Sequence, residues 1–288
     1  MFKENLVNQN LSSAFNVPKI SDKEFYKLKE YIEKHTGIKI TESKRFLIQA
    51  RLLKRLKALN LCNFSDYCSY VFQSNDLKEI VNLIDSITTN KTEFFREANH
   101  FYYLKNKILP EIFSKKQCIN IWSAACSTGE EPYTIAMVVS DFIEKFNLNK
   151  SFSVLGSDIS TKVLRTAITA IYPYEKINEV PKEYYKYFLK SKNPENKVIR
   201  VAPEIRKVVQ FKRINLLEDF SFLNSMDIIF CRNVFIYFEK KTQEMIAKKF
   251  YSLLEKEGIL FIGHSETFQG IETEFKRVAP SVYQKVIL

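Results

Sequence analysis

The chain is poor in glycine. Only 6 of its 288 residues are glycine, and no set of them forms the G-x-G-x-x-G spacing with which dinucleotide-binding folds hold a pyrophosphate. This absence disfavours a nicotinamide dehydrogenase. Long apolar runs are also missing, because no stretch approaches the roughly 18 residues of a membrane-spanning helix, and the first residues contain no apolar signal-peptide segment. We therefore expect a cytoplasmic protein that does not insert into a membrane.

Residue patterns that hold metals are missing as well. The 5 cysteines are odd in number and scattered, without a C-x-x-C pair, and the 3 histidines (His35, His100 and His264) are isolated in the sequence. Cysteines in this pattern indicate neither a zinc site nor a disulfide framework, and they are typical of the reduced thiols of a cytosolic protein. We therefore predict no metal site.

Acidic residues are fewer than basic ones, 33 against 44, so the formal net charge is +11 and an electronegative partner is expected. Part of this excess lies in residues 39–57, where seven basic residues stand against one acid. At helical spacing, Lys44, Arg51 and Arg55 fall on one stripe. Such a stripe is typical of a solvated helix face, and the alternative is a docking surface for an acidic substrate.

Residues 118–133 have the pattern of a buried strand, a turn of small residues and the start of a helix. Ile119 and Ile121 are strand residues, and the residues of Ser123–Gly129 are small enough for a ligand to approach the backbone closely. Pro132 suits the first turn of a helix, where its missing N–H is no loss. In Rossmann-type sheets a unit of this kind opens a nucleotide site at the carboxyl ends of the strands.

Acidic residues near this turn indicate which nucleotide it binds. Glu130 and Glu131 at the helix start would repel a phosphate and attract a cation. A second strand, Phe152–Gly156, leads to Asp158, at about the right distance for an acidic residue that holds a ribose. A phosphate-free nucleoside with a positive centre fits both features, and S-adenosylmethionine is such a molecule. The alternative is that Asp158 only caps the helix beginning near Ser160, while the two glutamates complement a helix dipole.

The N-terminal part of the chain, about the first 90 residues, is expected to be all-helical. Ser21 and Glu24 have the spacing of a capping box, and the helix that follows should stop near Gly37. Further helices are expected at residues 43–60, 65–73 and 76–87.

From about Cys118 onward the pattern becomes α/β. Further strands are expected at residues 208–214, 226–231 and 258–263, with a last and antiparallel strand at 278–287. Between Tyr172 and Lys207 four prolines and short β-prone pieces interrupt the alternation of strands and helices. We interpret this segment as an inserted sub-domain.

Four segments of the chain resemble the CheR-type chemotaxis receptor methyltransferases. They are Thr89-Asn90-Lys91-Thr92-Glu93-Phe94-Phe95-Arg96, Trp122-Ser123-Ala124-Ala125-Cys126-Ser127-Thr128-Gly129-Glu130-Glu131-Pro132-Tyr133, Cys231-Arg232-Asn233-Val234-Phe235-Ile236-Tyr237-Phe238 and Gly263-His264-Ser265-Glu266. The resemblance implies an all-α N-terminal domain (1–88) and a Rossmann-like, α/β, S-adenosylmethionine-dependent methyltransferase domain (89–288). It also implies that the linker 89–117 contributes to the cofactor site and that a small antiparallel β sub-domain is inserted at about 172–207.

The resemblance also implies the reaction, which is methyl transfer from S-adenosylmethionine to the γ-carboxylate of particular glutamates on chemoreceptors. The products are a glutamate methyl ester and S-adenosylhomocysteine. The family's cofactor contacts match Asn90, Thr92, Arg96, Glu130, Asp158, Asn215, Leu216, Arg232 and Asn233 here. Arg96 and Tyr237 match residues close to the transferring methyl group and are the candidate catalytic residues. The alternatives are a surface salt bridge for Arg96 and a core position for Tyr237.

The resemblance gives partners to two surfaces. The basic stripe of Lys44, Arg51 and Arg55 would dock the glutamate-rich methylation helices of receptors. In some family members the β sub-domain grips a peptide at the receptor C-terminus. The corresponding turn here, Lys190–Lys197, contains no glycine, which we would expect in a peptide-binding version, so this partner stays open. We expect a monomer that binds no nucleic acid.

Two alternative functions share the fold. A nucleic-acid methyltransferase would explain the positive charge, but the N6-adenine and N4-cytosine enzymes need (Asp/Asn)-Pro-Pro-(Tyr/Phe) where this chain has Arg232-Asn233-Val234-Phe235. The C5-cytosine enzymes need a Pro-Cys pair, which is absent. A sensor that binds the cofactor without catalysis is the second alternative, and the intact Arg96, Glu130, Asp158 and Tyr237 argue against it.

Overall fold

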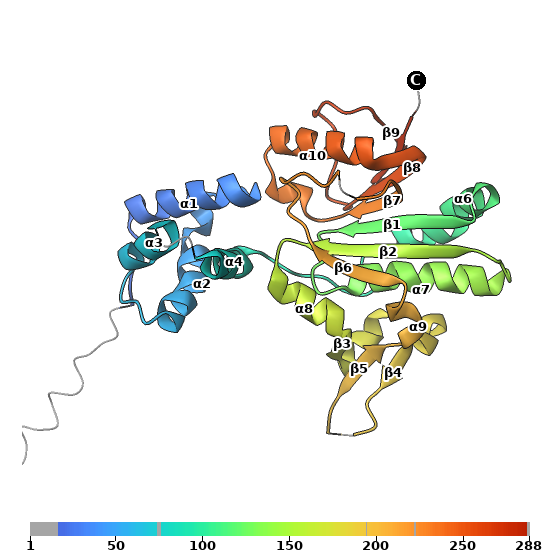
Figure 1. The fold of residues 1–288 in the computed structure, drawn as a ribbon, viewed down its shortest axis with the longest axis horizontal. Helices are drawn as coiled ribbons and strands as arrows, with labels where there is room; N and C mark the ends of the chain where they lie inside the picture. The colour runs from blue at the N-terminus through green and yellow to red at the C-terminus, as the bar shows by residue number, and fades with distance from the viewer. Residues whose placement is uncertain (1–16, 74–75, 194, 222, 287–288) are drawn as a thin grey trace, which may run out of the picture. The chain divides into compact units, whose positions relative to one another are not determined.

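The computed structural model describes residues 17–73, 76–193, 195–221 and 223–286. These residues divide into two compact units, whose elements are labelled in Figure 1. The first unit contains Ile40–Ile87 and the described residues up to Lys34, and the second contains His35–Lys39 and the described residues from Thr88 onward. None of the helices in these ranges combines the length and the apolar character that a membrane span requires.

The first unit is all-helical. Its elements are α1 (Asp22–Thr36), the 3₁₀-helix η1 (Glu42–Lys44), α2 (Arg45–Ala58), α3 (Phe64–Gln73) and α4 (Leu77–Ile87). The capping box of α1 is present, because Ser21 N donates to Glu24 Oε2 (2.7 Å) and Glu24 N donates to Ser21 Oγ (3.4 Å). Apolar residues at helical spacing, Phe25, Leu28 and Ile32, are buried. The helices predicted from the sequence pattern are confirmed to within a few residues.

The second unit contains a seven-stranded sheet with the order β6-β2-β1-β7-β8-β10-β9. The strands are β1 (Cys118–Ala124), β2 (Ser151–Asp158), β6 (Val209–Arg213), β7 (Met226–Cys231), β8 (Leu254–Ile262), β9 (Phe275–Ala279) and β10 (Val282–Lys285). The strands from β6 to β8 in this order are parallel, whereas β10 is antiparallel to β8 and β9. The strand order reverses between β1 and β7, and a ligand site is expected at the carboxyl ends of the strands beside such a point.

The C-terminal strands differ in detail from the sequence prediction. Strand β8 begins at Leu254, before the expected Gly258, because α10 ends at Leu253 and no loop separates the two elements. The single strand predicted over 278–287 includes residue 287, which lies outside the described residues; its described part is the end of β9 followed by β10. Pro280 cannot donate a ladder hydrogen bond, and Ser281, with a φ of 56°, turns the chain between the two strands.

Helices cover both faces of the sheet, as parallel strands require. The helices are α5 (Asn99–Tyr103), the π-helix η2 (Leu104–Ile108), α6 (Leu109–Lys115), α7 (Glu130–Lys145), α8 (Thr161–Thr169), α9 (Pro203–Arg206) and α10 (Lys240–Leu253), with the 3₁₀-helix η5 (Phe235–Tyr237). Residues of β7 alternate between the two layers. Ile228 and Phe230 pack in the cluster that contains α7, whereas Ile229 and Cys231 pack in the cluster that contains α10.

The inserted sub-domain is a small antiparallel sheet of order β3-β5-β4 (Figure 1). It comprises β3 (Ile171–Pro173), η3 (Tyr174–Glu179), η4 (Lys182–Tyr187), β4 (Phe188–Lys190) and β5 (Val198–Val201). Its two 3₁₀-helices each begin directly after a proline, Pro173 and Pro181. The predicted insertion in place of a simple crossover helix is confirmed.

Candidate active site

The small-residue turn after β1 bends sharply and is fixed to β2. Ser127 and Gly129 have φ values of 50° and 95°, in the left-handed region. Cys126 N donates to Ser157 O (2.7 Å) at the end of β2. A Cβ atom on Gly129 would lie 2.8 Å from the Cβ of Ala167 on α8, so both the conformation and the packing require glycine here.

Asp158 joins the ends of β1 and β2. Its side chain is buried, and its Oδ2 accepts from Ser127 N (2.9 Å) while Oδ1 accepts from Ser160 N (2.9 Å). Ser127 Oγ in turn donates to Asn90 O (3.0 Å), which brings the linker to the same place. Asp158 therefore supports the start of α8 through Ser160 N, but the N-cap residue of this helix is Ser160, whose Oγ accepts from Val163 N (3.4 Å).

Glu130 begins α7 as a buried carboxylate. Thr128 Oγ1 donates to its Oε2 (2.6 Å), and Lys176 Nζ lies 3.5 Å from its Oε1. Burial raises the pKa of Glu130, although the bond from Thr128 and the charge of Lys176 oppose the rise. The carboxylate therefore sits in a place of low polarity, where a cationic ligand gains most from it.

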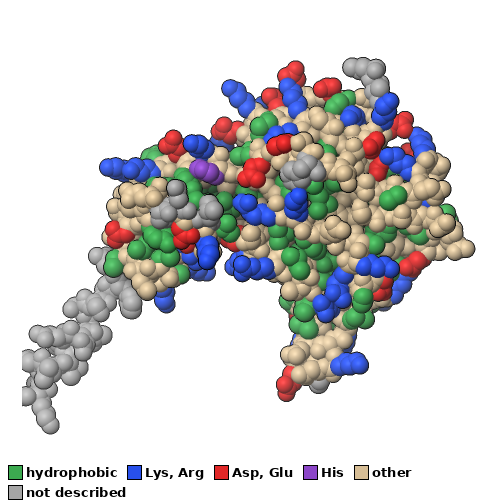
Figure 2. All heavy atoms as spheres, viewed as in Figure 1, with side chains coloured by type: hydrophobic (Ala, Val, Ile, Leu, Met, Phe, Trp, Pro, Cys, Tyr) green, Lys and Arg blue, Asp and Glu red, His purple; other side chains and the backbone are tan. Residues whose placement is uncertain are grey.

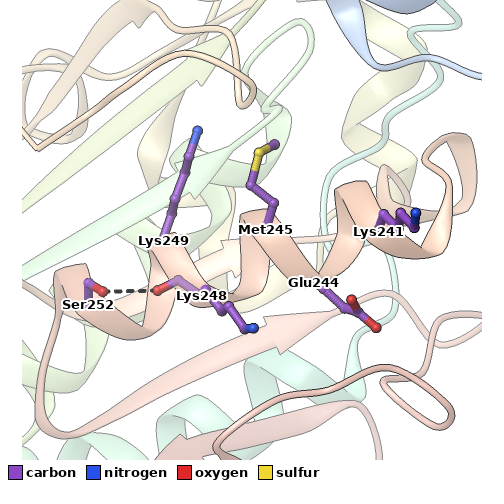
Figure 3. Close-up of a pocket in the computed structure, with 6 residues that line it drawn as sticks. All are labelled: Lys241, Glu244, Met245, Lys248, Lys249 and Ser252. Carbon is purple, nitrogen blue, oxygen red and sulfur yellow. Dashed lines mark hydrogen bonds between the residues drawn. The ribbon is translucent and has the colours of Figure 1, made fainter.

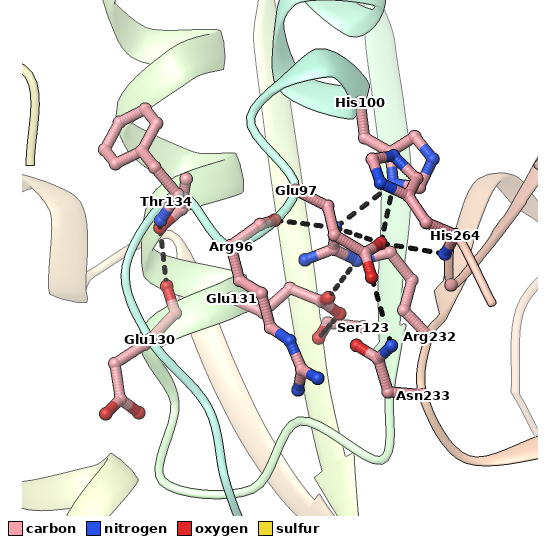
Figure 4. Close-up of polar contacts among 12 residues, drawn as sticks. Arg96, Glu97, His100, Ser123, Glu130, Glu131, Thr134, Arg232, Asn233 and His264 are labelled. Atoms are coloured by element: carbon pink, nitrogen blue, oxygen red, sulfur yellow. Dashed lines mark hydrogen bonds and ion pairs between the residues drawn. The ribbon is translucent and has the colours of Figure 1, made fainter. Parts of the chain in front are cut away.

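Glu131 points elsewhere, as Figure 4 shows. Its Oε1 accepts from Ser123 Oγ (2.7 Å) and its Oε2 accepts from Arg232 Nε (2.6 Å). The expectation that both glutamates attract a ligand cation is therefore corrected. The charge of Glu131 is balanced by the direct bond from Arg232 (2.6 Å), whereas Glu130, whose Lys176 partner is farther away (3.5 Å), keeps that role.

Arg232 is a buried residue that bonds to several other groups of the site. Its side chain is 2% exposed, and its Nη1 donates to Arg96 O (2.7 Å) and to Glu97 Oε2 (3.3 Å) and lies 3.1 Å from His100 Nδ1. Burial lowers the pKa of His100 to about 3, with the charge of Arg232 acting in the same direction, so the imidazole is neutral and its Nδ1 can accept from Arg232. Arg232, a predicted cofactor residue, thus makes all of these bonds to groups of the protein.

Asn233 and Tyr237 lie in the loop after β7, which Glu266 holds. Oε2 of Glu266 accepts from Asn233 N (2.9 Å) and Gly263 N (2.6 Å), and Oε1 accepts from Ile236 N (3.2 Å). Tyr237, in η5, is only partly buried, so it is not the core aromatic of the alternative interpretation. Sequence reasoning left Glu266 outside the site, although it belongs to one of the four family segments.

Arg96 is presented by two buried phenylalanines. Phe94 and Phe95 are 2% and 9% exposed, whereas Arg96 is only partly buried and its Nη1 donates to Lys91 O (2.9 Å). Within the described ranges Arg96 forms no ion pair, so the structure does not support the surface salt bridge. The guanidinium is thus bonded to a backbone carbonyl and not to an acidic partner.

The inserted sub-domain contacts the same loops. Hydrogen bonds from its first residues reach the linker and the turn after β1. The bonds are Tyr172 OH to Thr128 O (2.8 Å), Lys176 Nζ to Thr92 O (3.0 Å) and Phe94 N to Glu179 Oε2 (2.8 Å). The predicted site residue Thr92 is therefore positioned by the insertion as well as by its own segment.

Asn215 and Leu216 follow β6 and are buried. Asn215 Nδ2 donates to His35 O (2.8 Å), and a Cβ on Gly37, whose φ is 71°, would lie 2.9 Å from Leu217 Cδ2. The short segment His35–Lys39 thus packs beside a predicted cofactor residue, which no sequence pattern indicated.

The pocket in Figure 3 is lined by one helix only. Lys241, Glu244, Met245, Lys248, Lys249 and Ser252 of α10 line it. Lys249 Nζ donates to the carbonyl oxygens of residues 216–218 (3.4, 2.8 and 2.9 Å), so this lysine supports the segment after Asn215. Burial lowers its pKa. We interpret the pocket as a surface hollow beside a structural lysine.

One group among the described residues has the composition of a metal site: Glu97, His100 and His264. Arg232 Nη1 already lies 3.3 Å from the Glu97 carboxylate and 3.1 Å from His100 Nδ1. A guanidinium therefore occupies the position in which a bound cation would contact both ligands, and it supplies the positive charge there.

Comparison with known proteins decides the family. Residues 23–88 match the family described as CheR methyltransferase, all-alpha domain, and residues 90–283 match CheR methyltransferase, SAM binding domain. The chain belongs to the CheR methyltransferase family. It is 40% identical over 285 residues to the chemotaxis protein methyltransferase of Borreliella burgdorferi, which covers 96% of this chain and 99% of the relative.

Relatives from distant bacteria agree with this assignment. The identity is 38% to the chemotaxis protein methyltransferase of Salmonella typhimurium (92% of this chain, 90% of the relative) and 37% to chemotaxis protein methyltransferase 2 of Pseudomonas aeruginosa (90% and 92%). This CheR protein is thus an S-adenosylmethionine-dependent methyltransferase, and the predicted cofactor is confirmed. The donor set fits it, because buried carboxylates at Glu130 and Asp158 suit an ammonium or sulfonium and a ribose, and disfavour a phosphate.

Proposed function

We propose that this CheR methyltransferase methylates the γ-carboxylate of specific glutamates on the cytoplasmic methylation helices of chemoreceptors. The products are glutamate 5-O-methyl ester and S-adenosylhomocysteine. The observation that carries the proposal is spatial. Segments far apart in the sequence, carrying Arg96, Asp158, Arg232 and Glu266, are hydrogen-bonded to one another or to neighbouring loops at the carboxyl ends of parallel strands.

The methyl transfer requires few catalytic groups from the protein. A glutamate side chain has a pKa near ~4.3 and is ionised at neutral pH, so the nucleophile needs no general base. S-adenosylmethionine supplies an activated methyl group on a positively charged sulfur. Because the two opposite charges disappear in the transition state, excluding water favours the reaction once the carboxylate is aligned with the methyl group. We assign that alignment to Arg96 and Tyr237. We assign cofactor binding to Asn90, Thr92, Arg96, Glu130, Asp158, Asn215, Leu216, Arg232 and Asn233.

The product distinguishes this function from its rivals. With S-adenosylmethionine tritiated in the methyl group and receptor-containing membranes, we expect label in the receptor that base releases as volatile methanol, because only a carboxyl ester is cleaved this way. Receptors whose methylated glutamates are replaced by alanine serve as the control. Base-stable label, label in added DNA or RNA, or cofactor binding without transfer would contradict the proposal.

The basic stripe of Lys44, Arg51 and Arg55 is less exposed in the structure than its helical spacing alone suggests. Arg51 Nη1 donates to Ile87 O (2.6 Å), and Arg55 donates through Nε and Nη2 to the carboxylate of Glu79 (3.0 and 2.5 Å), which is 2% exposed. Like Lys44, these arginines are half-buried. The charge of Arg55 is balanced by Glu79. We propose that Lys44 and Arg51, and to a smaller extent Arg55, contribute to receptor docking together with the exposed residues of α2.

The exposed residues of α2 include Phe46, Leu47, Lys54 and Lys57, with Phe46 80% exposed. Elsewhere, on the face drawn in Figure 2, Lys and Arg side chains are spread among acidic ones and do not form one patch. We therefore direct the test of docking to α2.

Reversing the charge of both Lys54 and Lys57 to glutamate should raise the Michaelis constant for receptor about 10-fold and leave the turnover number nearly unchanged, because docking charges steer encounter. Steady-state kinetics at rising salt would measure this, and the effect should shrink as salt screens the wild-type charges. The double reversal of Lys23 and Lys27 to glutamate, two exposed lysines of α1, is the matched control. Equal effects of the two charge reversals on the Michaelis constant would indicate that the exposed face of α2 is only solvated and does not dock the receptor. Arg55→Glu is unsuitable, because it would set a second carboxylate against buried Glu79.

We propose the β sub-domain as the site where a receptor C-terminal peptide would bind. We also propose that the protein is a monomer. Strands β3 and β4 are both edges of the three-stranded sheet, the feature that peptide addition needs. The turn without glycine closes through side chains, because Asn193 N donates to Ser191 Oγ (3.2 Å) and Glu195 N donates to Asn193 Oδ1 (3.0 Å).

A further inference from the structure

We propose that Glu97 is a positioning residue for Arg96. Its carboxylate, together with Arg232, fastens the linker to the ends of β7 and β8 and so fixes the direction of the Arg96 side chain. The inference rests on the proposed function, in which Arg96 aligns the receptor carboxylate with the methyl group. Glu97 was not among the residues that the sequence indicated.

Glu97 bonds to two loops that are far from it in sequence (Figure 4). Its Oε1 accepts from Asn233 Nδ2 (3.1 Å), in the loop after β7, and its Oε2 accepts from His264 N (3.2 Å), in the loop after β8. The same Oε2 accepts from Arg232 Nη1 (3.3 Å). One partly buried carboxylate thus ties the linker to two neighbouring strand ends at the site.

The backbone around Arg96 is held in an unfavourable conformation. Phe95 and Glu97 have φ values of 55° and 57°, in the left-handed region that non-glycine residues rarely adopt. A residue between two such positions changes direction if either relaxes. Arg232 Nη1 also donates to Arg96 O (2.7 Å), so both the backbone of Arg96 and the side chain of the next residue are anchored.

The charges explain why a carboxylate is needed at this position. Arg232 is 2% exposed and carries one positive charge between Glu131 and Glu97, while His100 is neutral. Burial alone would raise the pKa of Glu97, but the bond from Asn233 and the charge of Arg232 lower it, so the group is ionised at neutral pH. Removing Glu97's charge leaves Arg232 paired with Glu131, so the core of the site should survive the change.

A double-mutant cycle tests the proposal. In the full-length protein, Glu97→Gln should lower the single-turnover rate of receptor methylation about 10-fold, because the amide keeps the shape but loses the charge and one acceptor. In the Arg96→Ala background the same change should cost less than about 2-fold, since the residue that Glu97 orients is gone.

Glu93→Gln, a carboxylate of the same linker, is the matched control and should leave the rate unchanged. An equal loss in both backgrounds would overturn the proposal, because Glu97 would then act independently of Arg96 through general stability. An unchanged rate for Glu97→Gln would overturn it as well. If the wild-type protein itself formed no base-labile ester, the proposed function would have failed, and this outcome is separate because it needs no variant.

Discussion

Replacing Asp158 with alanine should weaken binding of S-adenosylhomocysteine by at least about 100-fold. A hydrogen bond to a charged group contributes about 1.5–3 kcal/mol, and a carboxylate that binds both ribose hydroxyls would lose two of them. The loss should be larger than this pair alone suggests, because Asp158 also accepts from Ser127 N and Ser160 N, and its removal loosens the turn on which the cofactor rests. Isothermal titration calorimetry measures the effect.

A matched control separates binding from stability. Glu204→Gln changes an exposed carboxylate at the start of α9 and should leave the affinity as it is. Denaturant unfolding of Asp158→Ala should show a folded protein with a lower unfolding free energy, since two buried N–H groups lose their partner. If the folded variant bound the product with wild-type affinity, Asp158 would only support the turn before α8.

Replacing Arg96 with alanine should lower kcat/KM for receptor methylation on the order of 100-fold, because a positive group aimed at a reacting carboxylate acts in a site from which water is excluded. The stability of the fold should change little, since Phe94 and Phe95 anchor the linker and the guanidinium is bonded only to Lys91 O among the contacts described here. Rapid-quench single-turnover kinetics with saturating cofactor would measure the loss.

Tyr237→Phe is the natural comparison, because it removes one hydroxyl from a half-buried side chain. We expect turnover to fall only about 5-fold, the usual cost of one neutral hydrogen bond. Arg96→Lys should recover part of the Arg96→Ala loss, because the positive charge returns without the forked donor geometry. Wild-type single-turnover rates in both Arg96→Ala and Tyr237→Phe would refute these two roles.

Local patterns predicted the parts of the site that one segment builds. Strand, turn and helix around Gly129 follow from residue size and apolar spacing, and the ribose candidate Asp158 follows from its place at the end of β2. The positions of these residues depend on contacts within one α/β unit, so the sequence of that unit is sufficient to predict them.

Long-range charge pairs could not be predicted in this way. Glu131 and Arg232 are 101 residues apart, and Glu97 and Asn233 are 136 apart, so no periodicity connects them. The same reason explains Arg55, whose place on a helix stripe is predictable but whose partner Glu79 lies on α4. A helical pattern gives the direction of a side chain, whereas its burial depends on the neighbouring helix.

The hydrogen bonds from Tyr172, Lys176 and Glu179 make the small sheet a support of the cofactor loops. Free-energy coupling between two ligand sites is reciprocal: if occupation of the cofactor pocket changes the affinity of the small sheet for a peptide, the peptide should change the affinity for the cofactor by the same factor. We therefore expect that a ligand at the outer edge of the insertion would bind more tightly or more weakly according to whether the methyl donor is bound.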